Sequence, residues 1–123
     1  MSRTRRSAKQ AGSRFERHIA DHLNKHVDDR IDRRVTTGAK DRGDIAGLRY
    51  RGERIVIECK NTTRANLAGW INEAHTAAGN DDALIGVIAH KRHGKAYAGD
   101  QWITMTLDDL ITLLTLTRPK DGQ

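Results

Sequence analysis

Residues 43–60, GDIAGLRYRGERIVIECK, decide the fold of this chain. The pattern predicts one strand over residues 44–50 and a second over residues 53–60. Arg51 and Gly52 between them are typical of a tight turn. The two strands are therefore expected to pair as a hairpin.

The charged residues of this hairpin are expected to gather at one end. Side chains alternate along a strand, so Glu58 and Lys60 should lie on one face and Cys59 on the other. The turn can return Glu58 to the neighbourhood of Asp44 at the start of the first strand. Two carboxylates and an ammonium in one place are what a Mg²⁺-dependent phosphodiesterase requires, because Mg²⁺ prefers hard oxygen ligands.

Apolar residues on both sides of the hairpin predict further helices and strands. Phe15, Ile19, Leu23 and Val27 recur every four residues, which is the spacing of one face of a helix. The expected elements are a helix over residues 13–29, a strand over 31–37, the two hairpin strands, a helix over 66–78, a buried strand over 83–89, a strand over 101–105 and a helix over 106–116. This order predicts an α/β fold in which a mixed sheet is flanked by helices.

The chain of 123 residues is expected to form one domain. Residues 1–12 carry several cations, no acid and almost nothing that could pack in a core, so we expect a flexible basic arm there. The domain itself is expected over residues 13–117, followed by a polar tail over 118–123.

The composition favours a polyanionic partner. The net charge is +6, and nucleic acid is the commonest soluble polyanion, although a basic protein without such a partner could have the same composition. A single cysteine excludes an intrachain disulfide and a Cys-based zinc site, and it fits a reducing cytosol. The longest apolar run, residues 83–89, is too short to span a membrane, and no apolar segment follows the basic N-terminus as it would in a secretory signal.

The triplet Glu58-Cys59-Lys60 gains its value from its context, since an acid-x-Lys triplet occurs by chance about once in 140 positions. It ends an apolar strand, an acid opens the partner strand, and a helix follows. In these features the chain resembles the PD-(D/E)xK nuclease superfamily, and within it the small archaeal and phage-type resolvases that cut Holliday junctions. The resemblance covers residues 13–90 and rests on Asp44-Ile45, on the triplet and on Glu16. It implies a restriction-endonuclease-like fold with an α-β-β-β-α-β core.

The resemblance also implies roles for individual residues. Asp44 and Glu58 would be ligands of Mg²⁺, with the backbone carbonyl of Cys59 as a third, and Mn²⁺ is expected to substitute. Such a cation lowers the pKa of a water molecule and offsets charge on the phosphate. Lys60 would orient that water or stabilise the developing charge. Family members leave a 5′-phosphate and a 3′-hydroxyl. The proline that often precedes the first acid is replaced here by Gly43.

Two further acids have alternative interpretations. In the resolvases that this chain resembles, a glutamate of the first helix holds a water molecule at the metal, and Glu16 is the candidate for that catalytic role. The alternative is an exposed carboxylate near a helix N-terminus. Asp41 is a rival for Asp44, but Asp44 directly precedes the apolar strand, so we expect Asp41 to be a loop acid.

Cations along the chain are candidates for contact with DNA phosphates, which supplies affinity without sequence preference. The alternative is that the N-terminal group forms a solubilising tail and that Lys40 and Arg42 face solvent. The candidates are Arg3, Arg5, Arg6, Lys9, Arg14, Arg33, Arg34, Lys40, Arg42, Lys91, Arg92 and Lys95.

Histidine and tryptophan residues form two more patterns. His18, His22 and His26 are spaced by one helical turn, but no zinc motif accompanies them, so we interpret them as a solvated or DNA-facing stripe. Trp70 and Trp102 are expected in the core or at an interface, and stacking on an unpaired base is the alternative.

These observations predict a Mg²⁺-dependent, structure-selective DNA endonuclease. The resemblance favours resolution of four-way junctions in DNA recombination and repair, in the cytoplasm of a prokaryotic or phage-infected cell. A homodimer is expected because a four-way junction has two-fold symmetry, and surplus leucines over residues 110–116 could form its interface or complete the core. The alternatives are a related nuclease that cuts flaps, single strands or duplex, and a basic nucleic-acid-binding module without catalysis.

Overall fold

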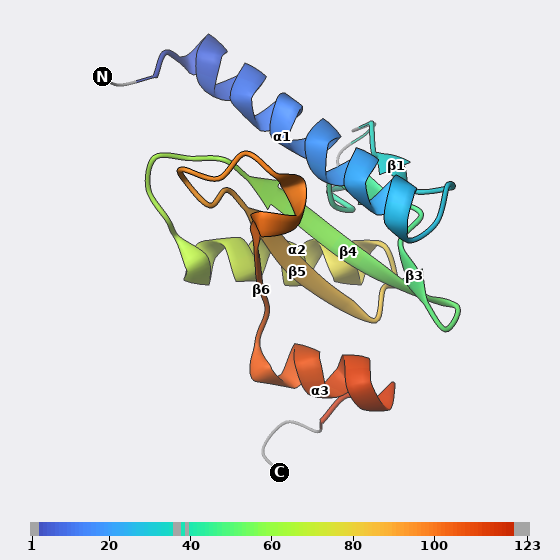
Figure 1. Ribbon diagram of the computed structural model, residues 1–123. Coiled ribbons are helices and arrows are strands. Elements are labelled where there is room, and N and C mark those ends of the chain that lie inside the picture. Colours follow the sequence, from blue (N-terminus) through green and yellow to red (C-terminus); the bar gives the residue numbers. More distant parts are fainter. Residues whose placement is uncertain (1–2, 36–37, 39, 120–123) are drawn as a thin grey trace.

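A four-stranded mixed sheet forms the centre of the computed structural model, which describes residues 3–35, 38 and 40–119 (Figure 1). The strand order is β3-β4-β5-β6, in which β4 and β5 are parallel and the outer pairs are antiparallel. The strands are β3 (Arg49–Tyr50), β4 (Glu53–Lys60), β5 (Ile85–His90) and β6 (Trp102–Thr104). A separate two-stranded antiparallel sheet pairs β1 (Asp32–Arg33) with β2 (Ile45–Ala46).

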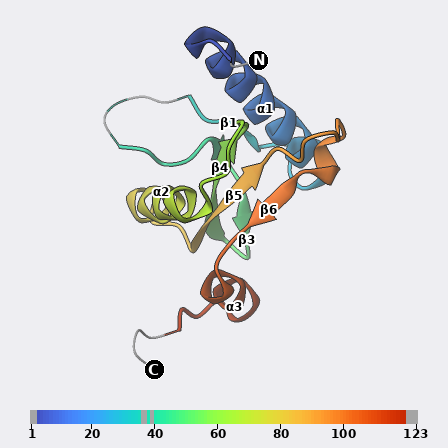
Figure 2. The same cartoon turned by 90° about the vertical axis from the view of Figure 1, so that its left-hand side faces the viewer.

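Helices cover both faces of the central sheet, as Figure 2 shows. α1 (Arg5–His26) packs on one face and α2 (Leu67–Asn80) on the other. α2 connects β4 to β5, as a parallel pair requires. α3 (Leu107–Thr115) contacts β5. A short 3-10 helix, η1 (Ala98–Asp100), precedes β6. The predicted fold class, a mixed sheet flanked by helices, is confirmed.

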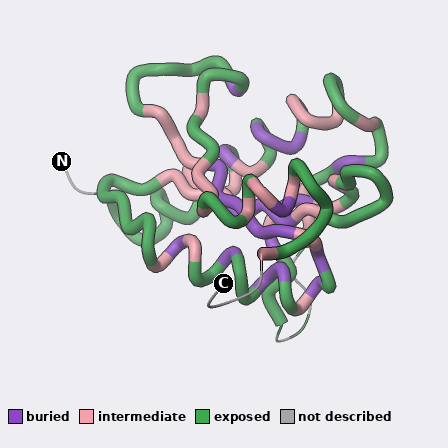
Figure 3. Tube along the Cα trace, turned by 90° about the horizontal axis from the view of Figure 1, so that it is seen from below, coloured by how far each residue is buried: buried purple, intermediate pink, exposed green. Residues whose placement is uncertain are grey.

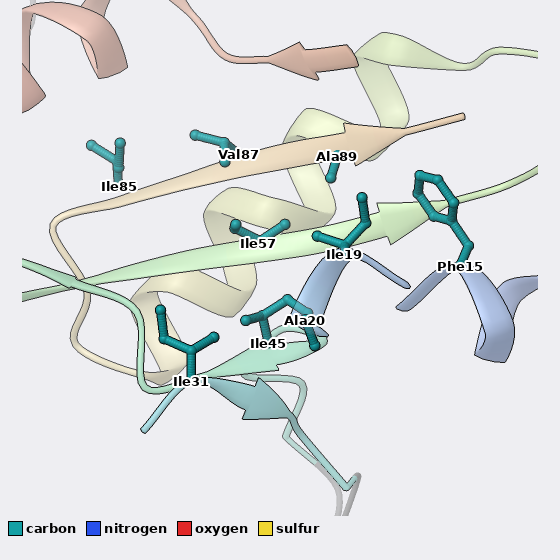
Figure 4. Packing of buried hydrophobic residues seen from close by; sticks show 9 residues of the cluster. All are labelled: Phe15, Ile19, Ala20, Ile31, Ile45, Ile57, Ile85, Val87 and Ala89. Atoms are coloured by element: carbon teal, nitrogen blue, oxygen red, sulfur yellow. The ribbon is translucent and has the colours of Figure 1, made fainter. Parts of the chain in front are cut away.

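The core consists of two apolar layers, one on each face of β4 and β5. Figure 4 shows the layer beneath α1, in which Ile19 lies beside Ile57 of β4, and Phe15 lies at the end of the layer nearer Ala89 of β5. The layer beneath α2 contains mostly alanines of the helix against Val56 of β4. Buried residues gather in the middle of the molecule, whereas the segments around them are mostly exposed (Figure 3). Glu58 lies on the same face of β4 as Val56, as predicted, and this face is the one that α2 covers.

The expected flexible arm is wrong for residues 5–12, which form the first turns of α1. Thr4 caps the helix, and its side chain accepts a hydrogen bond from the Ser7 N–H at 3.0 Å. The following Arg, Ala, Lys and Gln residues have high helix propensity, so the segment is helical although it packs against little. In the described part of the chain, no helix is both long enough and apolar enough to cross a lipid bilayer.

The two strands expected before residue 51 are much shorter than predicted. The first hairpin strand is interrupted between β2 and β3 at Gly47, where φ is +87° and a Cβ atom would lie 2.6 Å from the carbonyl oxygen of Arg30. The strand expected over residues 31–37 is limited to β1, and Val35 is 77% exposed. Residues 36 and 37 lie outside the described residues.

The C-terminal half agrees closely with the pattern. Asn66 caps α2, and its side chain accepts from the Gly69 N–H at 3.2 Å. Thr106 and Asp109 form the expected capping box at the start of α3. Arg118, expected in the tail, donates instead to the carbonyl of Ala83 at 2.7 Å, and residues 120–123 lie outside the described residues.

Candidate active site

Asp44 and the C-terminal end of β4 are joined by two backbone contacts. The Asp44 N–H donates to the carbonyl of Ile57 at 2.8 Å, and the Cys59 N–H donates to Asp44 Oδ2 at 2.7 Å. The carboxylate is therefore held beside the Glu58-Cys59-Lys60 triplet. The structure brings Asp44, Glu58 and Lys60 together, as the hairpin pattern predicts.

Gly43 explains the departure from the proline of the family pattern. Its φ is +91°, whereas proline is fixed near −65°, so proline could not adopt this conformation. A Cβ atom at Gly43 would also lie 2.7 Å from Cγ1 of Val56. The glycine lets the backbone approach β4 closely immediately before Asp44.

The Glu58 side chain is buried, and one of its oxygens has no hydrogen-bond partner in the described part of the chain. It is 4% exposed, and no donor among the described residues reaches its Oε1 atom. Its neighbours within hydrogen-bonding reach are the carboxylates of Asp41 and Asp44, so Glu58 can bond to them only when it is protonated and donates. Burial and these neighbours raise the pKa of Glu58 far above that of an exposed glutamate. Burial also raises the pKa of Asp44, although the Cys59 N–H opposes this shift.

Asp41 belongs to the same site, which the sequence did not predict. Its Oδ1 accepts from the Gly43 N–H at 2.8 Å, and its carbonyl accepts from the Asn80 side chain at 2.7 Å. A hydrogen bond with Glu58 lowers the pKa of Asp41. Asp41 is a loop residue, as expected, but the loop carries it to within reach of Glu58.

Lys60 forms an ion pair with Glu73 of α2, with 2.6 Å between Nζ and Oε2. Burial disfavours its charged form, but the carboxylates of Glu73, Glu58 and Asp44 together outweigh burial and raise the pKa of Lys60. The ammonium is therefore protonated at neutral pH. Glu73 was not among the predicted site residues. Glu73 lies three residues after the buried Trp70, so it is on the same side of the helix. This spacing could have indicated that Glu73 approaches the sheet.

Glu16 lies at the border of the site on α1. Its side chain is 17% exposed and forms an ion pair with Arg33 at 3.6 Å. Burial first, and then the charge of Asp44, raise the pKa of Glu16, while Arg33 opposes the shift. The first helix thus brings this carboxylate towards Asp44. Arg33, which is predicted to contact DNA, pairs with Glu16 in the absence of DNA.

The donor set fits a hard divalent cation. Asp44 and Glu58 offer carboxylate oxygens, and the unpartnered Glu58 Oε1 is the kind of atom that a cation satisfies. Burial strongly raises the pKa of the Cys59 thiol, so the sulfur stays protonated and only its backbone oxygen is a candidate ligand. The described residues contain no group of three or more His, Cys, Asp and Glu side chains arranged to hold a metal by themselves. Such a site would be completed by water and phosphate oxygens.

Comparison with protein families supplies the deciding observation. Residues 7–115 match the family model described as "Phage putative PDDEXK endonuclease", which covers most of the chain and the whole site. The chain belongs to this PDDEXK endonuclease family. Its nuclease superfamily acts on DNA and typically uses divalent metals. Comparison with curated proteins and with solved structures gives no match.

The predicted DNA-contacting cations of this PDDEXK endonuclease differ in their surroundings. Arg3 donates to the carbonyl of Asn61, directly after Lys60, at 2.7 Å. Lys91 donates to the carbonyl of Lys95. The remaining candidates include exposed side chains on α1 and in loops, namely Arg5, Arg6, Lys9, Arg14, Lys40, Arg42 and Lys95.

A basic hollow of about 360 Å³ lies beside β2 and the start of β4. Four arginines line it, of which only Arg34 and Arg42 were predicted to contact DNA; Arg49 and Arg54 were missed. The buried Asp81 accepts from Arg34 at 3.4 Å, and its carbonyl accepts from Arg54 at 2.7 Å. Asp81 thus holds two of the four guanidinium groups in place, and the other charged residues that line the hollow are arginines.

The predicted histidine stripe is exposed at His18 and His26 and half-buried at His22, and its members also contact the chain. His18 Nε2 is 2.9 Å from the carbonyl oxygen of Ala96, and the ring of His22 packs edge-on against Tyr97 at 5.2 Å. His22 also packs against His26. These contacts hold the basic loop over residues 91–99 against α1, which is a structural role that helix spacing alone could not reveal.

Proposed function

We propose that this PDDEXK endonuclease is a Mg²⁺-dependent enzyme that resolves four-way DNA junctions in recombination and repair, in the cytoplasm. The observation that carries the proposal is the meeting of Asp44 and the buried Glu58 beside the ammonium of Lys60. Two acids and one cation suit hydrolysis of a phosphodiester better than binding alone, because a structural role does not require an unpartnered buried carboxylate.

Each residue of the site has a distinct proposed role. Asp44, Glu58 and the backbone carbonyl of Cys59 hold the cation, and Mn²⁺ substitutes for Mg²⁺. When bound, the cation activates water and neutralises charge on the phosphate. Lys60 leaves Glu73 for a phosphate oxygen, since both partners are anionic. Glu16 accepts a hydrogen bond from the attacking water.

Exposed apolar residues on α3 support a homodimer. Leu107 and Leu114 are 72% and 73% exposed, and Leu110 between them is 40% exposed. Their spacing along the helix forms a single stripe that the described core does not cover. Two active sites related by two-fold symmetry match the symmetry of a four-way junction.

The double variant Leu107→Glu/Leu114→Glu is therefore expected to be monomeric. Light scattering after size exclusion should show half the wild-type mass, because charges on the stripe prevent its burial. The variant should still nick junctions, but the two nicks should no longer be paired within one binding event. Leu67→Glu, at a 44% exposed leucine on α2, is the matched control and should remain dimeric. A wild-type monomer would contradict the proposed dimer.

The substrate is tested with labelled four-way junction, matched duplex, flap and single strand, each with Mg²⁺, with Mn²⁺ and with chelator. We expect paired symmetric nicks on the junction, with a 5′-phosphate and a 3′-hydroxyl, and no cutting in chelator. Equal cutting of duplex would contradict junction selectivity. Binding without cutting of any substrate would favour a non-catalytic basic module.

A further inference from the structure

The strand register aligns three side chains in one row across the sheet. Lys60 of β4 pairs with His90 of β5, and His90 pairs with Trp102 of β6. Paired residues project from the same face, so the row lies on the side of Glu58 and α2. Neighbouring strands are about 4.8 Å apart, which puts Trp102 about 10 Å from Lys60, the rise of about three stacked nucleotides.

A pocket of about 340 Å³ opens along this row. This volume lies within the range of about 300–1,000 Å³ typical of small-molecule sites. Its walls combine aromatic rings with cations and hydroxyls, and the lining side chains include Lys60, Trp70, His90, Lys91, His93 and Trp102. Aromatic faces beside cations are complementary to a nucleotide, whose base stacks and whose phosphate is anionic.

Trp102 is held in place but remains accessible. It is 48% exposed, whereas Trp70 is 8% exposed and packs against His90 at 5.5 Å between ring centres. The guanidinium of Arg92 lies 4.5 Å from the centre of the Trp102 ring. Arg92 does not line the pocket, so this cation–π contact fixes the indole without filling the space.

We propose that this pocket receives an unpaired nucleobase close to the cleaved phosphate, and that Trp102 stacks on it. The inference rests on the proposed function of the neighbouring site. A base within a duplex is already stacked and paired, so it would have to be extruded at a cost, whereas a base at a branch point is partly freed. The pocket therefore accounts for selection of branched DNA by a surface whose other contacts are with the sugar-phosphate backbone.

The proposal is tested by a double-mutant cycle between protein and DNA. Binding of a four-way junction is measured in the Glu58→Gln background without metal, so that cleavage does not interfere. Trp102→Ala is combined with an abasic site placed in turn at each branch-point nucleotide, which removes the base but keeps the phosphate. Trp102→Ala alone, and the abasic site alone at the position whose base enters the pocket, should each weaken binding about fivefold or more, because stacking is worth about 1–3 kcal/mol per base. At one position the two together should weaken it no further.

Controls separate stacking from loss of an exposed ring. Tyr50→Ala removes a 39% exposed aromatic residue that also has an arginine, Arg51, 5.5 Å from its ring centre, but at the opposite end of the sheet. Its effect and that of each abasic site should simply multiply. If Trp102→Ala unfolds, Trp102→Leu takes its place in the cycle. Leucine keeps bulk on the edge strand but has no aromatic ring to stack on a base.

The outcomes distinguish this inference from the proposed function. Independent effects of Trp102→Ala and every abasic site would overturn the base pocket, even if the wild-type enzyme cuts junctions. Coupling at one position supports the pocket, even if the wild-type protein cuts no DNA and the proposed catalysis fails.

Discussion

Lys60→Ala, Glu58→Gln and Asp44→Asn are each expected to reduce DNA cleavage on the order of a thousandfold or more, while junction affinity changes little. In the proposed mechanism these groups act on the reacting phosphate, whereas affinity would come from a basic surface spread over the chain. Single-turnover cleavage at saturating enzyme, together with filter binding in chelator, separates the two quantities.

The control for this prediction is Glu53→Gln. Glu53 lies at the start of the same strand as Glu58, but it is exposed and remote from the site. Its replacement should leave the cleavage rate unchanged. Wild-type cleavage by any one of the three site variants would refute the role assigned to that residue. Asp41→Asn then tests the remaining carboxylate within reach of Glu58.

The second large effect concerns stability. Glu58→Gln is expected to raise the free energy of unfolding of the metal-free protein by on the order of 1 to 3 kcal/mol at pH 8. In the wild-type protein, the folded state holds Glu58 protonated because burial and two acidic neighbours raise its pKa. Glutamine is neutral at every pH, so the variant avoids the cost of retaining that proton.

The pH dependence follows from the direction of the shift. Below the unfolded pKa of about 4.5, both states of the wild-type protein carry the proton and Glu58 contributes no penalty. As pH rises through the window between the unfolded and the raised folded pKa, the unfolded state releases the proton and the folded state does not. Wild-type stability should therefore fall across this window, and that of Glu58→Gln should fall less.

Urea unfolding at a series of pH values measures both effects. Added Mg²⁺ or Mn²⁺ should stabilise the wild-type protein and flatten its pH profile, because a bound cation replaces the proton. The same addition should have little effect on Glu58→Gln. Parallel pH profiles for the two proteins, with and without cation, would contradict the raised pKa of Glu58 in the folded state. Glu53→Gln should follow the wild type throughout.

Local sequence patterns predicted much of the fold and the centre of the site. Strand alternation placed Glu58 and Lys60 on one face, and side-chain signals located the start of α2 at Asn66. The fold class and the nuclease family are confirmed. These features depend on residues close in sequence, where spacing fixes geometry.

Local sequence patterns could not predict contacts between segments that are distant in the sequence. Nothing near Lys60 in sequence indicates its pairing with Glu73 on another element, and nothing near His18 indicates its contact with the carbonyl of Ala96. Asp41 was predicted as a loop residue, but its proximity to Glu58 depends on the path of that loop. The helix before residue 13 was not predicted because these residues have almost nothing to bury in a core, and their helical state depends on the cap at Thr4 and on local propensity.

The early start of α1 changes how the protein would meet DNA. A flexible segment loses about 1–2 kcal/mol of backbone entropy per residue when it becomes ordered, and a preformed helix has already lost it. Arg3 also ties the segment before this helix to Asn61, the residue after Lys60. The cations of the helix and the ammonium at the end of β4 therefore keep a fixed separation. A DNA strand bound by these helix cations would be aligned in advance with Lys60, and this separation would set the position of the proposed cleavage along the backbone.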